Sequence, residues 1–464
     1  MAEIGFVPSC RGGRLLLLQQ HLLSINRRKD EHTYWRCKVV GCRMTAVTSN
    51  DVLVSSNGEH NHPPDAGKVK QKVAIHKAKQ EAISQPQKSM KRVFADAFGN
   101  ENNEELMDHL PSFKRYRDTL YRARSQRLPH VPHNRQDIVL EGEWAETVDG
   151  RNFLLADDGI DNRIIIFGTM QNLRYMCQAD TIYMDGTFKL SPEMFLQIYS
   201  IHIEVMGTSI PVCVGLLPNK TQATYSRFLA LLVTKAAQIG LVFSPQIVCI
   251  DFEMAMLRTL QRLFPNSRIR GCLFHYSQAI WRKVQSLGLT ARYSDDDAFN
   301  RLVRRASALP LVPPQQVDDV WLQAMNEVDD DDDAQQFMDY VTTNWVDAFT
   351  ATFPMEIWNQ YDNIEGHRTN NHLESWHSVM NRQLNRPHPN IFALVELLKT
   401  EQQSNEQRLR LLQAGDAAPR QRPIHIRITE RLVRLRQRLI NGDIDVYHYA
   451  GAVAGVLKQQ VVRR

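Results

Sequence analysis

Three acidic residues far apart in the sequence could together hold divalent metal ions. Asp185 and Asp251 each lie at the end of an apolar, β-branched run, where a strand should finish. Glu374 lies in a helix-like stretch 123 residues after Asp251. Carboxylate oxygens are the ligands that magnesium and manganese prefer, and two such ions about 4 Å apart can cleave and join phosphodiesters. The three residues therefore predict phosphoryl transfer on nucleic acid.

Neighbouring carboxylates leave alternatives open. Asp180 could replace Asp185, although it lies where the strand begins. Glu253 could cap the helix that follows or assist the metal ligands, and Glu365 precedes a glycine, which is typical of a loop. A single aspartate at a strand end is more often a turn former or helix cap, so the prediction depends on the two aspartates as a pair.

A second group of residues has the composition of a zinc site. Cys37 and Cys42 are followed by His60 and His62. Of the seven cysteines, only Cys37 and Cys42 are close enough in sequence to suggest a shared metal. Two thiolates and two imidazoles form a closed tetrahedral set, as in structural zinc sites. A unit of about 65 residues has a small core, which a metal would stabilise. The alternative is two free cysteines beside a surface His-Asn-His.

The elements that must position the carboxylates follow a mixed α/β pattern. Residues 137–275 predict one mixed sheet with helices between its strands. The expected strands are 163–167, 180–190, 194–205, 210–217, 245–251 and 268–273, and the expected helices are 170–179, 225–239 and 254–264. Further helices are expected within 276–363, over 370–384 and, as a basic amphipathic helix, over 424–440. We expect the acidic run 329–333 to be an exposed turn or loop.

Composition shifts along the chain predict its domain organisation. The expected parts are a zinc finger at 1–65, a basic helical linker or DNA-binding region at 66–135, the first part of a catalytic core at 136–275, a helical insertion at 276–365, the last part of the core with Glu374 at 366–405, and a helical tail at 406–464.

The overall composition fits a globular protein. Hydrophobic residues make up 43% and charged residues 23% of 464, and no apolar run is long enough for a transmembrane helix, so we expect no membrane association. The first residues lack a basic start followed by an apolar core. We therefore expect neither a secretory signal nor disulfide bonds.

Charge is distributed unevenly along the chain. Residues 1–92 carry 16 Lys and Arg against 7 Asp and Glu, whereas the other 372 residues carry 40 against 44. A front end with a net charge of +9 on a body with a net charge of −4 indicates contact with a phosphate backbone, although a solvated basic surface would give the same pattern.

The N-terminal pattern resembles a FLYWCH zinc finger. The resemblance is carried by Phe6-x2-Ser9-x-Arg11-Gly12-Gly13, Tyr34-Trp35-x-Cys37, Cys42 and His60-x-His62. It implies that Cys37, Cys42, His60 and His62 bind zinc, and that the finger binds DNA or protein.

The rest of the pattern looks like a Mutator-like (MULE) transposase domain over about residues 112–405. The resemblance is carried by Asp185-Gly-Thr-Phe, Asp251-Phe-Glu, Gly271-Cys-Leu-Phe-His275, Trp358-Asn359 and Arg368-Thr-Asn-Asn-x2-Glu374-x2-His377. It implies a ribonuclease-H-like mixed sheet with a helical insertion before the glutamate. It also implies that Asp185, Asp251 and Glu374 form a triad that binds magnesium or manganese.

Several residues near the triad are expected to help it. The resemblance implies that Cys272 and His275 shape the active site or touch DNA, although a buried cysteine and a hydrogen-bonded histidine would explain them equally. His377 should lie on nearly the same helical face as Glu374, where it could orient the carboxylate or contact DNA. Arg368, Asn370 and Asn371 could hold phosphate or bases.

The resemblance implies a nuclear DNA transposase that recognises element ends through its finger and then cuts and joins duplex DNA. Because two ends must be held together, we expect a homodimer or larger assembly. Two alternatives stay open: a domesticated DNA-binding or regulatory protein without catalytic activity, and a ribonuclease-H-like nuclease that acts on RNA.

Overall fold

The structure of the protein is a computed structural model that describes most of the chain. The described residues are 4–9, 13–64, 66–85, 88–99, 112–125, 128–130, 132–159, 161–329, 331–366, 368–384, 387–416 and 422–461. The chain forms two compact units. The first comprises Met1–Val131 with Gln383–Asn385 and Ile391–Glu396, and the second comprises Pro132–Arg382, Arg386–Asn390 and Leu397–Arg464.

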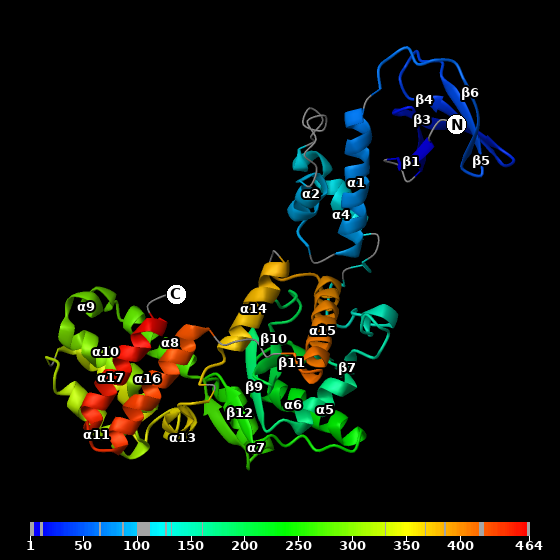
Figure 1. The fold of residues 1–464 in the computed structure, drawn as a ribbon. Helices are drawn as coiled ribbons and strands as arrows, with labels where there is room; N and C mark the ends of the chain where they lie inside the picture. The colour runs from blue at the N-terminus through cyan, green and yellow to red at the C-terminus, as the bar shows by residue number, and fades with distance from the viewer. Residues whose placement is uncertain are drawn as a thin grey trace. The chain divides into compact units, whose positions relative to one another are not determined.

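The first unit begins with a six-stranded antiparallel sheet that forms a half-barrel, with its strands in sequence order (Figure 1). The strands are β1 Ile4–Pro8, β2 Arg14–Leu18, β3 His21–Lys29, β4 His32–Cys37, β5 Thr45–Ser49 and β6 Val52–Asn57. Two hairpins close through pairs of residues with positive φ, at Gln19–Gln20 (51° and 60°) and Asn50–Asp51 (47° and 66°). Such two-residue turns match the right-handed twist of the strands that they join.

The half-barrel encloses a small apolar core. Trp35 is 1% exposed and packs with Leu16, Leu23 and Met44, and its indole donates a hydrogen bond to Thr48 Oγ1 at 2.8 Å. The two cysteines of the finger lie in the same core. The core is therefore continuous with the metal-ligand region.

Helices follow the half-barrel within the first unit. They are α1 Ala66–Ser84, α2 Met90–Gly99 and α4 Phe113–Ser125. Ala74, Ala78 and Ala82 recur every fourth residue of α1 and are buried against Val93 and Leu120. Small side chains at this spacing let helices approach closely.

The second unit is built on a seven-stranded mixed sheet with the order β13-β12-β9-β10-β11-β8-β7 (Figure 1). Its strands are β7 Leu154–Asp157, β8 Ile165–Phe167, β9 Thr181–Thr187, β10 Gln197–Val205, β11 Thr208–Leu217, β12 Ile247–Ile250 and β13 Arg268–Gly271. β9, β10 and β11 form an antiparallel meander, whereas β12 runs parallel to β9 and β13 parallel to β12. Helices α6 Gln222–Gln238 and α7 Met254–Leu263 make the connections that parallel strands need.

The two faces of this sheet bury different side chains. Ile182 and Met184 of β9 join a large apolar core with α5 Met170–Gln178, α6 and α7. Tyr183 of β9 and Cys249 of β12 point to the opposite face and pack against Leu373 of α14 Asn371–Leu384. Helix α14 therefore covers the second face at the junction of β9 and β12.

A helical region with its own core separates β13 from α14. Trp321, Trp345 and Trp358 are each at most 1% exposed and pack with Tyr276 in this core. The helices are α8 Leu273–Ser286, α9 Thr290–Asp295, α10 Asp297–Ala308, α11 Val317–Met325, α12 Asp332–Val341 and α13 Met355–Trp358. The chain ends with α15 Ile391–Gln413, α16 Pro423–Ile440 and α17 Val446–Val461.

The sequence-based expectations for these elements hold to within a few residues at each end, with three exceptions. Helix α15 was not expected as a helix over its length. Strand β7 at Leu154–Asp157 was not expected. The acidic run is not simply a loop, because Asp331 caps α12 by accepting hydrogen bonds from the backbone of Asp333 and Ala334, and Asp332 and Asp333 form the first helical turn. Acidic residues at this position stabilise a helix N-terminus, which explains the difference; Asp330 lies outside the described residues. Among the described helices, none has the length and apolar character needed to cross a membrane.

Gly215 offers a test of the packing between β11 and α6. A Cβ atom at this position would lie 2.6 Å from Cε2 of the buried Phe228. We expect Gly215→Ala to lower the free energy of unfolding by about 1–3 kcal/mol, because the ring must move within a close-packed core. Denaturant unfolding measures the change.

A matched control is Gly451→Ala in α17, where the nearest atom to an added Cβ is 4.0 Å away. This change should be neutral or stabilising by up to about 1 kcal/mol, because alanine favours the helix. Equal losses at both positions would contradict the packing argument.

Candidate metal centres

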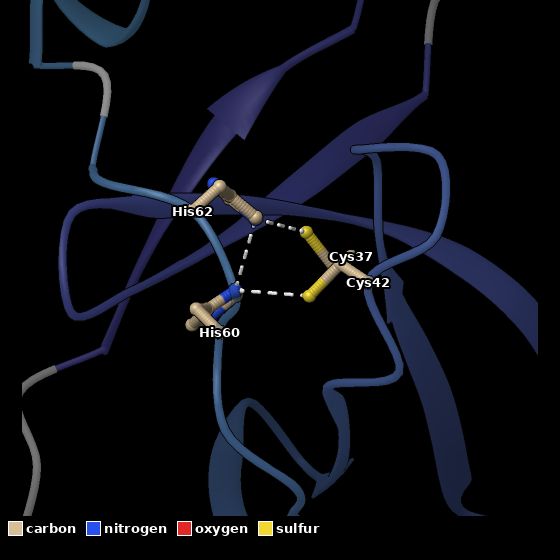
Figure 2. Close-up of side chains that lie close together, drawn as sticks. All are labelled: Cys37, Cys42, His60 and His62. Carbon is tan, nitrogen blue, oxygen red and sulfur yellow. Dashed lines mark hydrogen bonds between the residues drawn. The ribbon is translucent and has the colours of Figure 1, made fainter.

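The four zinc-ligand candidates come from three neighbouring segments of the finger. Cys37 ends β4, Cys42 lies in the loop that follows, and His60 and His62 lie after β6. The loop is a tight knuckle, because the Cys37 amide donates to Met44 O at 3.0 Å and the Cys42 amide to Val39 O at 3.2 Å. Figure 2 shows the four side chains pointing toward one another.

The distances within this cluster suit a zinc ion. Cys37 Sγ lies 3.2 Å from His62 Nε2, Cys42 Sγ lies 3.4 Å from His60 Nδ1, and the two histidine nitrogens are 3.3 Å apart (Figure 2). Tetrahedral zinc with the usual bond lengths would separate such sulfur and nitrogen atoms by about 3.6 Å and two nitrogens by about 3.3 Å. The cluster therefore supports a structural zinc site formed by all four predicted residues.

Hydrogen bonds around the cluster favour the protonation states in which these side chains bind a metal. His62 Nδ1 lies 3.0 Å from the carbonyl of Pro63, so a proton on Nδ1 leaves Nε2 free to coordinate. Burial tends to raise the pKa of the Cys42 thiol, but hydrogen bonds that include those from the backbone of Met44 and Asn61 outweigh it and lower the pKa to about 7. A lower pKa favours the thiolate that zinc binds.

His21 is a neighbour of the cluster that the sequence analysis missed. Its ring is stacked on His60, with centroids 3.6 Å apart, and meets the edge of His62 at 4.8 Å. It is 8% exposed and lies at the start of β3. His21 does not fit the spacing of a metal-ligand motif, so the sequence alone does not point to it. Its ring contacts with His60 and His62 become visible only in the folded structure.

The two aspartates of the second unit are brought side by side by neighbouring strands. Tyr183 of β9 pairs with Cys249 of the parallel strand β12. Asp185 and Asp251 each lie two residues after these paired residues. Parallel strands lie about 4.8 Å apart, and alternate residues share a face. Both aspartates therefore face α14, as Tyr183 and Cys249 do.

Glu374 reaches the same place because the start of α14 is fixed to the sheet. Leu373 is fully buried against Tyr183 and Cys249. The Asn370 side chain donates to Met184 O at 3.4 Å, and the Asn370 amide donates to Cys272 Sγ at 3.1 Å. These contacts hold the first helical turn, which carries Glu374, over β9.

The resulting cluster contains carboxylates and histidines at short range. One ligand atom from each of Asp185, His275 and Glu374 lies within 4.8 Å of the others. His275 Nε2 is 3.4 Å from Glu374 Oε1, and His377 Nδ1 is 3.6 Å from Asp185 Oδ2. Asp251 is near enough for its charge to act on Asp185.

Two buried oxygen atoms in this cluster have no hydrogen-bond partner among the described residues. They are Asp185 Oδ2 and Asp251 Oδ1. A buried carboxylate oxygen without a donor is costly unless a cation compensates it. Oxygen donors from two strands and a helix therefore fit hard divalent cations such as magnesium or manganese.

Proximity and burial change how these groups titrate. Burial, followed by the charge of Asp251, raises the pKa of Asp185 to about 7, and burial also raises the pKa of Asp251. Burial lowers the pKa of His377 to about 4. Burial would also lower the pKa of His275, but the Cys272 thiol and the Glu374 carboxylate outweigh it and raise that pKa to about 11. Burial therefore favours the neutral form of His377, whereas the Glu374 carboxylate favours the charged form of His275.

The other predicted auxiliary residues lie mostly inside the protein. Asn370 and Cys272 are 1% and 2% exposed and bond to each other as described above. His377 is 5% exposed and lies 3.3 Å from Ser200 Oγ through Nε2, so it faces β10. Arg368 donates to Ile364 O and to Thr429 Oγ1. The buried side-chain oxygen of Asn371 has no hydrogen-bond partner among the described residues.

The alternative carboxylates have other positions. Asp180 is exposed just before β9, and Glu365 forms an ion pair with Arg436 at 2.8 Å. Glu253 occupies the N-cap position of α7, as expected, but its side chain makes no capping hydrogen bond to a described residue. Its carboxylate instead accepts a hydrogen bond from Tyr225 at 3.0 Å, and Gln197 donates to the same hydroxyl at 2.7 Å. This buried network was missed because its members are separated in sequence.

We predict that removing one thiolate abolishes zinc binding by the finger. Full-length Cys42→Ser protein should lose its zinc, because the closed site needs four ligands, and the first 65 residues should become sensitive to protease. Elemental analysis of dialysed protein and limited proteolysis measure both effects. Cys177→Ser is the control, since Cys177 lies on α5 away from the cluster; zinc retained by Cys42→Ser would contradict the assignment.

Comparison with known families assigns two regions of the chain. Residues 6–62 match the FLYWCH zinc finger domain, and residues 181–279 match the MULE transposase domain. The second match includes Asp185, Asp251, Cys272 and His275 and ends before Glu374. No curated protein matches the chain. Together with the geometry of the cysteine and histidine cluster, these matches show that the chain carries an N-terminal FLYWCH zinc finger domain followed by a MULE transposase domain.

Proposed function

We propose that the protein is a DNA transposase of the Mutator-like type. In this proposal, Asp185, Asp251 and Glu374 hold magnesium or manganese and support cleavage and strand transfer of duplex DNA. The observation that carries the proposal is the meeting of Asp185 and Asp251 with a helix that starts more than a hundred residues later. They meet at buried oxygens that have no donor among the residues the structure describes. The two matched domains support a transposase-type DNA-binding function.

The topology supports a ribonuclease-H-like core. Three antiparallel strands, β9 to β11, are followed by β12 and β13 parallel to β9, which gives the spatial order β13-β12-β9-β10-β11. In that arrangement the first strand is central, and its end lies beside the end of the fourth. Asp185 lies two residues before the end of β9, and Asp251 directly follows β12.

Each residue of the cluster has a role that its surroundings suggest. Bound magnesium or manganese would activate an attacking hydroxyl and stabilise the leaving oxygen. Asp185 is fixed by its strand and by the Gly186 amide, which donates to Oδ1 at 2.8 Å, so Oδ2 stays available. The cationic His275 holds Glu374 and lessens repulsion between the carboxylates. The neutral His377 positions Asp185 from the other side.

Two further parts of the proposal concern assembly and location. A dimer or larger assembly is proposed because strand transfer needs two DNA ends held together, and sedimentation of the protein with and without DNA tests it. A nuclear location is proposed because the DNA substrate lies there, and imaging of the tagged full-length chain tests it.

Neutral substitutions of the triad test the catalytic proposal. We expect Asp185→Asn, Asp251→Asn and Glu374→Gln each to lower metal-dependent cleavage at least about a hundredfold, because each removes a cation ligand. Cleavage and joining are measured on a plasmid that carries the genomic DNA flanking the coding region. Asp185→Asn should fold at least as stably as the wild type without metal, since it removes a buried like charge.

Asp180→Asn is the matched control, because Asp180 is exposed just before the same strand. If the triad variants cleaved DNA at the rate of the wild-type protein, the proposal would be wrong. An inactive wild-type protein that still binds DNA would favour the alternative of a transposase-derived DNA-binding protein. Cleavage of an RNA–DNA hybrid in preference to duplex DNA would favour the ribonuclease.

Metal binding should depend on pH in a defined direction. The raised pKa of Asp185, about 7, keeps this carboxyl protonated below that pH, and cation binding must displace the proton. The affinity for manganese should therefore fall by about tenfold for each pH unit below 7. Calorimetry between about pH 5 and 8 measures it. His377 titrates near pH 4 and His275 near pH 11, outside this window, so affinity that rises as pH falls would contradict the assignment.

A further inference from the structure

Helix α16 carries a stripe of exposed arginines outside both metal centres. Arg427, Arg431, Arg434 and Arg438 are all exposed. Their spacing of four, three and four residues places them on one face of the helix. We call these four residues the arginine stripe.

The rest of α16 is fixed to the second unit. Ile428 and Leu432 are 4% and 0% exposed and pack with helix α17. Arg436 is ion-paired with Glu365 at 2.8 Å, and Thr429 accepts a hydrogen bond from Arg368 at 3.1 Å. Both bonds join α16 to the segment that leads into α14, so the stripe is mounted on the unit that carries the triad.

The stripe has little acidic compensation within the described part of the chain. Arg434 lies 3.7 Å from Glu430, and both side chains are more than half exposed, which makes the pair weak. Arg427, Arg431 and Arg438 form no ion pair with a described residue. Like charges three and four residues apart destabilise a helix, so a bound anion would reduce the repulsion between these arginines. A stripe that is simply solvated would leave this repulsion in place.

The dimensions of the stripe suit a phosphate backbone. From Arg427 to Arg438 the helix rises about 16 Å, at about 1.5 Å per residue. One strand of B-DNA advances about 3.4 Å per nucleotide, so the stripe spans four or five phosphates. Guanidinium groups bind phosphate oxygens in pairs and keep their charge at any physiological pH.

The charge of the helix contrasts with that of its surroundings. Residues 423–440 contain five arginines and one glutamate, whereas residues 93–464 as a whole have a net charge of −4. A positive surface on an otherwise slightly negative body directs a polyanion to one place.

We propose that the arginine stripe of α16 binds the sugar–phosphate backbone of duplex DNA without regard to sequence. The stripe rests on the proposed transposase function for its role, since it would hold the DNA on which the triad acts. It is a separate surface, and binding through it requires neither a metal nor cleavage.

Salt dependence of binding tests the stripe directly. The full-length triple variant Arg427→Ala, Arg431→Ala, Arg438→Ala is compared with the wild type on a short fluorescent DNA duplex, from about 50 to about 200 mM salt. Each lost phosphate contact should lower the slope of log affinity against log salt by about 0.9, so the triple variant should lose about 2.7. Its affinity at the lowest salt should fall at least about tenfold.

The control has the same change of charge at other exposed arginines of the second unit. Arg174→Ala, Arg258→Ala, Arg408→Ala removes three exposed arginines from α5, α7 and α15. This protein should keep a slope within about one unit of the wild type. Equal loss in both triple variants, or no loss in the stripe variant, would overturn the proposal. So would tighter binding of a matched RNA duplex that depends on the same three arginines.

The test separates this inference from the proposed function. If the stripe variant both binds and cleaves DNA as the wild type does, the inference about the stripe is wrong and the proposed catalytic function stands. A wild-type protein that never cleaves, yet loses about 2.7 from its salt slope in the stripe variant, removes the catalytic proposal and keeps the stripe. Circular dichroism confirms that α16 stays helical, as alanine favours.

Discussion

Burial of two neighbouring carboxylates is the constraint on which the second unit depends. Asp185 is 3% exposed and lies in β9 two residues before its end, and Asp251 directly follows the neighbouring parallel strand β12. Each charge raises the free energy of its neighbour, and their shared environment excludes much of the water that would screen them. His275, whose pKa is raised beside Glu374, offsets part of this repulsion, but two carboxylate oxygens have no donor within the described part of the chain. The two carboxylates therefore stay close together only because the backbone that carries them is held rigidly. Strands β9 and β12 are central in the sheet, and the apolar core on the opposite face holds them in place.

The same constraint explains why a long helical insertion is tolerated within the core. Residues between β13 and α14 form an apolar core around Trp321, Trp345 and Trp358, to which Tyr447 and Ala450 of α17 also belong. Phe252, next to Asp251, packs against Trp345 and joins this core to the sheet. The chain returns to the sheet through a few specific bonds: the Gln360 side chain donates to Gly271 O, and the Asn370 amide donates to Cys272 Sγ. These bonds join the end of β13 and the residue after it to the segment that leads into α14, so they help to place Glu374 over the sheet.

Local patterns predicted most of the secondary structure because apolar periodicity is a local property. The strands that carry Asp185 and Asp251 were found in this way, and the cysteine and histidine spacing indicated the zinc cluster. What the sequence could not show is which distant side chains share a face. The stacking of His21 on His60, the Tyr225 to Glu253 hydrogen bond and the burial of His377 against β10 all arise from strand order and helix docking. Glu253 illustrates the limit: its position suited a helix cap, but a tyrosine from another helix binds its carboxylate.

In the described part of the chain, cysteine and histidine lie close together in the finger and in the second unit, and their surroundings differ. In the finger, both thiols and both imidazoles converge at distances that a tetrahedral ion requires, and a carbonyl fixes the tautomer of His62. In the second unit, Cys272 Sγ accepts a backbone amide and His275 lies against a carboxylate. Within the described residues no second thiol joins that pair, and oxygen atoms dominate its surroundings. Ligand softness therefore separates the two centres: the sulfur-rich set suits zinc, whereas the carboxylate set suits a hard cation beside phosphate.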